Sequence, residues 1–203
     1  TITALALWMG LRPPIAPPRE VRWLQVPAPQ LSLVKDSTID ISRDGSRLIY
    51  VGEQNGKRQL YLGPLDSREA TPMPNTENAL SPFFSPDGQW IGFWADQKLW
   101  KQPLSGGWTA LYDAPLSLWG LPLKATWGVD GWILFSGIEN SGVLKRIRDS
   151  GGTPERIVRS DIEKNEWYLY QPGMLPDGER ILFTGELAVL PVAVQSVKTG
   201  WRE

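Results

Sequence analysis

Four aspartates, each followed by a glycine, are the residues whose type and spacing first suggest chemistry. They recur at intervals of about 45 residues in one short phrase: Ser42-Arg43-Asp44-Gly45, Ser85-Pro86-Asp87-Gly88, Gly128-Val129-Asp130-Gly131 and Leu175-Pro176-Asp177-Gly178. Carboxylate oxygens are calcium ligands, but a calcium ion needs several of them close together. One aspartate per repeat, at equivalent hairpin tips, would keep the four apart. We therefore predict that Asp44, Asp87, Asp130 and Asp177 form turns and hold no metal ion.

The same phrase has the composition of a tight hairpin turn. Proline presets φ at the first central position, aspartate bonds to nearby backbone, and glycine accepts the positive φ that closes the hairpin. The glycines in question are Gly45, Gly88, Gly131 and Gly178. The third copy has one residue fewer between Gly131 and Ile133. Because a one-residue change would reverse the faces of the following strand, we expect the third hairpin to differ from the others.

Several kinds of chemistry are excluded by composition. The chain contains no histidine and no cysteine, which removes disulfides, thiolate metal sites, cysteine nucleophiles and histidine-based triads. It also lacks a Gly-x-Ser-x-Gly nucleophile elbow and the motifs of a protein kinase. The net charge is −1, which offers no basic surface for nucleic acid. We therefore predict no catalytic residue, no cofactor and no nucleic-acid partner for this segment.

Two aromatic loops are the candidate binding elements. Glu166, Trp167 and Tyr168 belong to a charged and aromatic stretch between the third and fourth repeats, and Trp119 lies in an apolar loop before the third. Loops on a rigid scaffold often carry binding residues, and exposed aromatic side chains can anchor a partner. The alternatives are a solvated connection for the first loop and an apolar plug between repeats for the second.

The elements that must position these residues are short strands. In the second repeat, apolar segments at 81–85, 90–94, 99–104 and 108–112 are separated by turn residues. Four such strands in each unit of 40 to 50 residues are typical of a propeller blade. We therefore predict an all-β propeller of about 3.5–4 four-stranded blades within residues 36–203. The repeats are placed at about 36–75, 80–114, 123–160 and 167–203, with the last one truncated.

The residues before the repeats differ in character. Residues 1–11 are almost all apolar, and a bilayer-spanning helix needs about 20 such residues. We interpret this stretch as the C-terminal part of a transmembrane or signal helix, which would make the membrane a partner. An apolar tail of a soluble protein is the alternative. Residues 12–35 are rich in proline, which predicts a stiff, extended linker with a short strand between Val21 and Val26.

The second repeat carries a family resemblance in the segment Phe84-Ser85-Pro86-Asp87-Gly88-Gln89-Trp90-Ile91-Gly92-Phe93. This segment resembles the TolB-type, WD-like propeller repeat of bacterial envelope proteins. Residues 58–66, 104–107 and 150–154 resemble the propeller found C-terminal to bacterial serine/threonine protein kinases. That resemblance implies a cytoplasmic kinase domain, one transmembrane helix, a proline-rich linker and a propeller outside the membrane.

The chain departs from this family pattern in two ways. Arg43 and Val129 occupy the position before the aspartate, where the other two copies have proline. About four repeats are present, whereas such propellers usually have about six blades or more. We therefore expect either further repeats beyond Glu203 or an open arc of blades.

The resulting functional hypothesis is a non-catalytic, extracytoplasmic binding or sensing propeller in a membrane-anchored bacterial serine/threonine kinase. Its ligand would be a protein or a small molecule bound on one propeller face. One alternative is a periplasmic TolB-like scaffold for protein interactions. Another is the N-terminal propeller of a prolyl-oligopeptidase-like serine hydrolase, whose catalytic domain would lie outside these residues.

Overall fold

The fold comes from a computed structural model of the chain. The structure describes residues 39–67, 69–113, 124–136, 142–160, 168–175, 177–186 and 192–198. Within them the chain forms four antiparallel sheets and no helix. The prediction of an all-β fold is therefore confirmed.

Each sheet contains strands that are consecutive in the sequence, and each strand pairs with the one before it. The first sheet contains β1 (Ile39–Ile41), β2 (Arg47–Gln54), β3 (Lys57–Pro64) and β4 (Thr71–Pro72). The second contains β5 (Leu80–Phe84), β6 (Trp90–Ala95), β7 (Lys98–Pro103) and β8 (Thr109–Asp113). The third contains β9 (Ala125–Trp127), β10 (Trp132–Ser136), β11 (Val143–Arg148) and β12 (Glu155–Arg159). The fourth contains β13 (Tyr168–Met174), β14 (Arg180–Glu186) and β15 (Ala193–Ser196).

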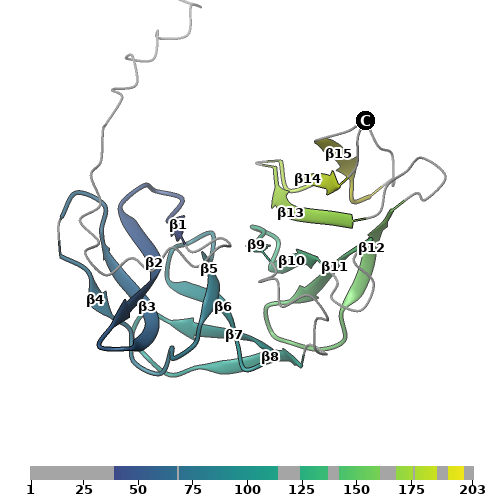
Figure 1. Ribbon diagram of the computed structural model, residues 1–203. Coiled ribbons are helices and arrows are strands. Elements are labelled where there is room, and N and C mark those ends of the chain that lie inside the picture. The colour runs from purple at the N-terminus through teal and green to yellow at the C-terminus, as the bar shows by residue number, and fades with distance from the viewer. Residues whose placement is uncertain are drawn as a thin grey trace, which may run out of the picture.

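The four sheets follow one another in an arc, as the blades of a propeller do (Figure 1). The first strand of each sheet lies innermost, and β1 contacts β5, β5 contacts β9, and β9 contacts β13. The predicted propeller is confirmed, with four blades. Three blades have four strands, and the fourth has three strands within the described residues.

In the second, third and fourth blades, the apolar pair after the Asp-Gly turn faces the preceding blade. Ile91 and Phe93 of the second blade pack with Ile49 and Val51 of the first. The equivalent pairs of the third and fourth blades, Ile133 with Phe135 and Ile181 with Phe183, are likewise buried in the cores that these blades share with their predecessors. Burial of each such side chain contributes about 1.5–3 kcal/mol, so the repeated pair holds neighbouring blades together.

The Asp-Gly turns connect the first and second strands of every blade. All four glycines have positive φ, with values of 70°, 66°, 77° and 69° at Gly45, Gly88, Gly131 and Gly178. In the second blade the Ser85 N–H donates to the Trp90 carbonyl, five residues on (2.9 Å). In the third, the Gly128 N–H donates to the Trp132 carbonyl, four residues on (2.8 Å). The third hairpin therefore differs as the sequence predicted.

The predicted membrane stub (residues 1–11) and proline-rich linker (residues 12–35) lie outside the described residues. Among the described residues, no helix is long and apolar enough to span a bilayer. The helical stub consequently has no support from the fold and stays a prediction.

Candidate functional site

The Asp-Gly turns of the blades border a common cavity. Its volume is about 260 Å³, and it is lined by the innermost strands and the turns that follow them. Arg43, Pro86 and Val129, which each precede the aspartate of their turn, all belong to this lining. We call it the turn-end cavity. The residue before the aspartate differs among these three repeats, and in each of them it lines the turn-end cavity.

The aspartates themselves are engaged within their own turns. The Ser85 hydroxyl donates to Asp87 Oδ1 (2.5 Å), and the same carboxylate oxygen accepts the Gln89 N–H (3.0 Å). Asp44 accepts equivalent bonds from the Ser42 hydroxyl (2.6 Å) and the Ser46 N–H (3.0 Å). These carboxylates therefore hold the turns closed.

The ionisation of these aspartates agrees with that role. Hydrogen bonds from Ser42 and Ser46 lower the pKa of Asp44 to about 2. The backbone N–H of Glu179 and the Arg180 side chain lower the pKa of Asp177 to about 2. The Ser85 hydroxyl, followed by the Gln89 N–H, lowers the pKa of Asp87. In the described part of the chain, no group of three or more carboxylates or other ligands could hold a metal ion.

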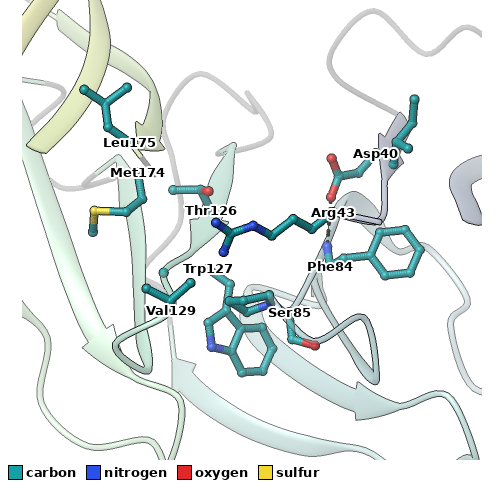
Figure 2. A pocket seen from close by; sticks show the side chains of 12 residues that line it. Asp40, Arg43, Phe84, Ser85, Thr126, Trp127, Val129, Met174 and Leu175 are labelled. Carbon is teal, nitrogen blue, oxygen red and sulfur yellow. Dashed lines mark hydrogen bonds between the residues drawn. The ribbon is translucent and has the colours of Figure 1, made fainter. Parts of the chain in front are cut away.

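Arg43 contributes an exposed cation to the turn-end cavity. Its side chain extends across the cavity toward Thr126 and Trp127 (Figure 2). Among the described residues, no hydrogen bond or ion pair engages its guanidinium. A guanidinium presents five N–H donors in a planar fork that fits a carboxylate. Arg43 can therefore bind an anionic group without giving up a contact of its own.

An apolar wall lies opposite the cation. Trp127 of β9, Val129 of the third turn, Met174 of β13 and Leu175 line the cavity together. Val129 is 58% exposed although its side chain is apolar. The Trp127 ring makes an edge contact with Phe83, with 6.3 Å between ring centroids, which holds the indole in place. Within the described residues, the cavity thus combines a guanidinium that no other group engages with apolar surface that partly faces solvent.

Asp40 is the carboxylate deepest in this region. It lies on β1, and its Oδ2 accepts the Phe84 N–H of the neighbouring blade (2.8 Å, dashed in Figure 2). Burial raises the pKa of Asp40, while hydrogen bonds from Phe84 and Ile41 and the charge of Lys124 oppose that rise. Asp40 therefore links the first two blades at the inner wall of the cavity.

The binding residues predicted from the sequence are not among those that line this cavity within the described residues. Trp119, Glu166 and Trp167 lie outside the described residues. Tyr168 begins β13, where its backbone pairs with Glu186. Sequence reasoning missed Arg43, Trp127 and Met174 as possible binding residues. The available signal was the departure of Arg43 and Val129 from the proline of the other two turns.

Comparison with known proteins places the fold. No protein-family model and no curated protein matches the chain. A TolB structure from Agrobacterium tumefaciens matches with a TM-score of 0.67 and 21% identity over 82% of this chain and 63% of the other. The chain has a TolB-like β-propeller fold. TolB from Acinetobacter baumannii matches with a TM-score of 0.67 and 16% identity over 82% of this chain and 42% of that one.

More distant matches extend beyond TolB. A chain of the nidogen–laminin complex gives a TM-score of 0.62 at 9% identity, over 81% of this chain and 62% of the other. A prolyl endopeptidase gives 0.54 at 12% identity, over 81% of this chain and 27% of that enzyme. This TolB-like chain therefore spans less than two thirds of each of these structures. The likeness establishes the fold and leaves the activity open.

Proposed function

We propose that this TolB-like propeller is a non-catalytic binding module whose turn-end cavity binds an acidic, partly apolar segment of a partner protein. The free guanidinium of Arg43 beside the apolar wall of Trp127, Val129 and Met174 carries this proposal. Arginine–carboxylate hydrogen bonds are charge-assisted and frequently bidentate. Apolar side chains of the same segment would cover the wall and remove it from water.

We propose a protein partner, rather than a small substrate, for this cavity. One structural neighbour is a chain of a complex between two proteins, nidogen and laminin. In our proposal the blades supply a rigid frame and the turn ends supply the contacting residues. Loops and turns on such a frame are common places for binding residues.

The cellular setting that we propose is extracytoplasmic. Support comes from the resemblance to bacterial envelope propellers and from the order of apolar stretch, proline-rich segment and propeller in the sequence. The same order supports membrane anchoring and a serine/threonine kinase as parent. Fractionation of cells that produce the full-length parent, with a kinase assay on the membrane fraction, tests both. A soluble cytoplasmic parent without kinase activity would overturn them.

The binding proposal is tested by selecting short random peptides displayed on phage against the full chain. We expect selected peptides to contain aspartate or glutamate beside apolar residues. Arg43→Gln should weaken their binding by about tenfold or more, because a hydrogen bond to a charged group contributes about 1.5–3 kcal/mol. Arg156→Gln, which removes another exposed arginine on the outer strand β12, is the matched control and should leave binding unchanged.

The contrary outcome is equally clear. Selected peptides that lack carboxylates, or that bind Arg43→Gln as well as the original chain, would overturn the proposal. An equal loss for Arg43→Gln and Arg156→Gln would indicate general charge attraction and would also count against the turn-end cavity.

A further inference from the structure

A second cavity lies along the same innermost strands. Its volume is about 400 Å³, and its lining comes from all four blades. It shares Asp40, Phe84 and Thr126 with the turn-end cavity but contains none of the residues that precede the turn aspartates. We call it the inner cavity. Small-ligand sites usually occupy about 300–1,000 Å³, so its size suits a small molecule.

Opposite charges line the inner cavity from different blades. Asp40 lies on β1, and Lys124 directly precedes β9. The charge of Lys124 acts on Asp40 by lowering its pKa, yet among the described residues no ion pair joins the two. Both groups line the same cavity, so one ligand that carries both charges can contact them there.

Two residues with strained backbone, Ser81 and Gln171, also line the inner cavity. Ser81 has φ +47°, directly before Pro82, and Gln171 has φ +49°, directly before Pro172. Both sit where strand pairing shifts register, in β5 and β13 respectively. Left-handed backbone is unfavourable for such residues and tends to occur at functional sites. The Ser81 hydroxyl is also buried without a hydrogen-bond partner among the described residues.

The rim of the inner cavity is apolar. Ile39, Leu182 and Val192 line it and are 50%, 39% and 51% exposed. Large apolar side chains that gather around one polar hollow, rather than being scattered singly, indicate a surface that is covered by a ligand. An apolar group of a few carbon atoms would cover these three side chains.

We propose that the inner cavity binds a small zwitterion with an apolar side chain, that is, an apolar amino acid. Its ammonium group would contact Asp40, its carboxylate would contact Lys124, and its side chain would cover Ile39, Leu182 and Val192. The Ser81 hydroxyl is placed at the wall to pair with a polar group of the ligand after rotation about χ1. This site adjoins the turn-end cavity, with which it shares Asp40, Phe84 and Thr126, but the proposal does not depend on peptide binding there.

The test is calorimetric titration of the full chain with L-leucine. We expect saturable binding that weakens by at least about tenfold for leucinamide, which lacks the carboxylate, and for 4-methylpentanoate, which lacks the ammonium group. Asp40→Asn and Lys124→Gln should each weaken leucine binding to a similar extent. The Asn side-chain oxygen can still accept the Phe84 N–H, so the contact between the first two blades is retained.

Arg43→Gln is the control, because Arg43 lines only the turn-end cavity, and it should leave leucine affinity unchanged. Absence of leucine binding at millimolar concentration, or equal binding of leucine and its two analogues, would overturn the proposal. If leucine binding fails in one of these ways while the selected peptides still bind, only the amino-acid site is overturned. The proposed function would then remain intact, so failure of the one proposal can be told from failure of the other. The unfolding temperatures of Asp40→Asn and Lys124→Gln would also be measured. Values close to that of the unchanged chain would show that a loss of leucine binding does not come from a loss of the fold.

Discussion

The Asp-Gly turns of the second and third blades occupy equivalent places in their blades but differ in length and in contacts. In the second blade the Ser85 hydroxyl joins the Asp87 carboxylate to the strand that follows, because it also accepts the Trp90 N–H (2.9 Å). In the third blade a glycine stands at the serine position, and the Asp130 carboxylate accepts the Trp132 N–H at 3.3 Å. The side-chain network is thus stronger in the second turn.

In the shorter turn of the third blade, Gly131 makes two backbone hydrogen bonds that two different residues make in the second blade. The Gly131 N–H donates to the Gly128 carbonyl (3.2 Å), and the Gly131 carbonyl accepts the Asp149 N–H (3.0 Å). In the second blade these roles fall to Gly88 and Gln89. A Cβ at position 128 would lie 2.5 Å from Asp130 Oδ1, so a side chain there would require the Asp130 carboxylate to move.

The two turns share some residues and differ at the position before the aspartate. Both turns keep a glycine with positive φ, and both are followed by a fully buried isoleucine, Ile91 or Ile133. The residue before the aspartate differs, since it is Pro86 in one turn and Val129 in the other, and it lines the turn-end cavity in both. Repeated residues therefore build the frame, and the unshared position is available for binding.

The largest effect is expected from Gly88→Val. A β-branched side chain at φ +66° should destabilise the chain by about 1–2 kcal/mol or more, although no atom lies closer than 3.9 Å to the added Cβ. For a chain of this size that corresponds to a drop of roughly 2–8 °C in the unfolding temperature. Differential scanning calorimetry measures it.

Gly88→Asn is the matched control, because asparagine tolerates left-handed backbone better than other residues with a side chain. It should lower the unfolding temperature less than Gly88→Val, and so should Asp87→Asn. Equal shifts for the three variants would contradict the turn geometry.

A smaller effect is expected from truncating the aspartates, and it should differ between the two turns. Asp87→Ala removes acceptors for the Ser85 hydroxyl and the Gln89 N–H and should cost about 1 kcal/mol. Asp130→Ala removes one long hydrogen bond and should cost less than about 0.5 kcal/mol. Urea unfolding of both variants gives the comparison, and a larger loss for Asp130→Ala would reverse our ranking of the turns.

The sequence predicted the frame better than the cavities. Repetition of the turn and of the apolar pair after it is local information, and it was sufficient for the propeller and for the unusual third hairpin. The turn-end cavity forms only when blades pack and bring Arg43 and Val129 to one space. Asp40 gave no signal because it is a single carboxylate outside any motif, and its contact with Phe84 crosses between blades.

The loops around Trp119 and Trp167 were favoured from sequence because they are not shared between repeats. Both loops lie outside the described residues, so a binding role for them stays a prediction. The structure adds that unshared residues also occur inside the repeated phrase itself, at Arg43 and Val129.

Our central claim is that the repeated residues stabilise the fold and the unshared residues bind the partner. Its most direct test compares Arg43→Gln with Gly45→Val, two changes two residues apart in one turn. Both the affinity for the selected peptides and the unfolding temperature would be measured for each variant. Arg43→Gln should weaken binding about tenfold or more and leave the unfolding temperature unchanged within roughly 1–2 °C. Gly45→Val, at φ +70°, should lower the unfolding temperature by several degrees. An Arg43→Gln variant that binds normally, or that unfolds as early as Gly45→Val, would contradict the account.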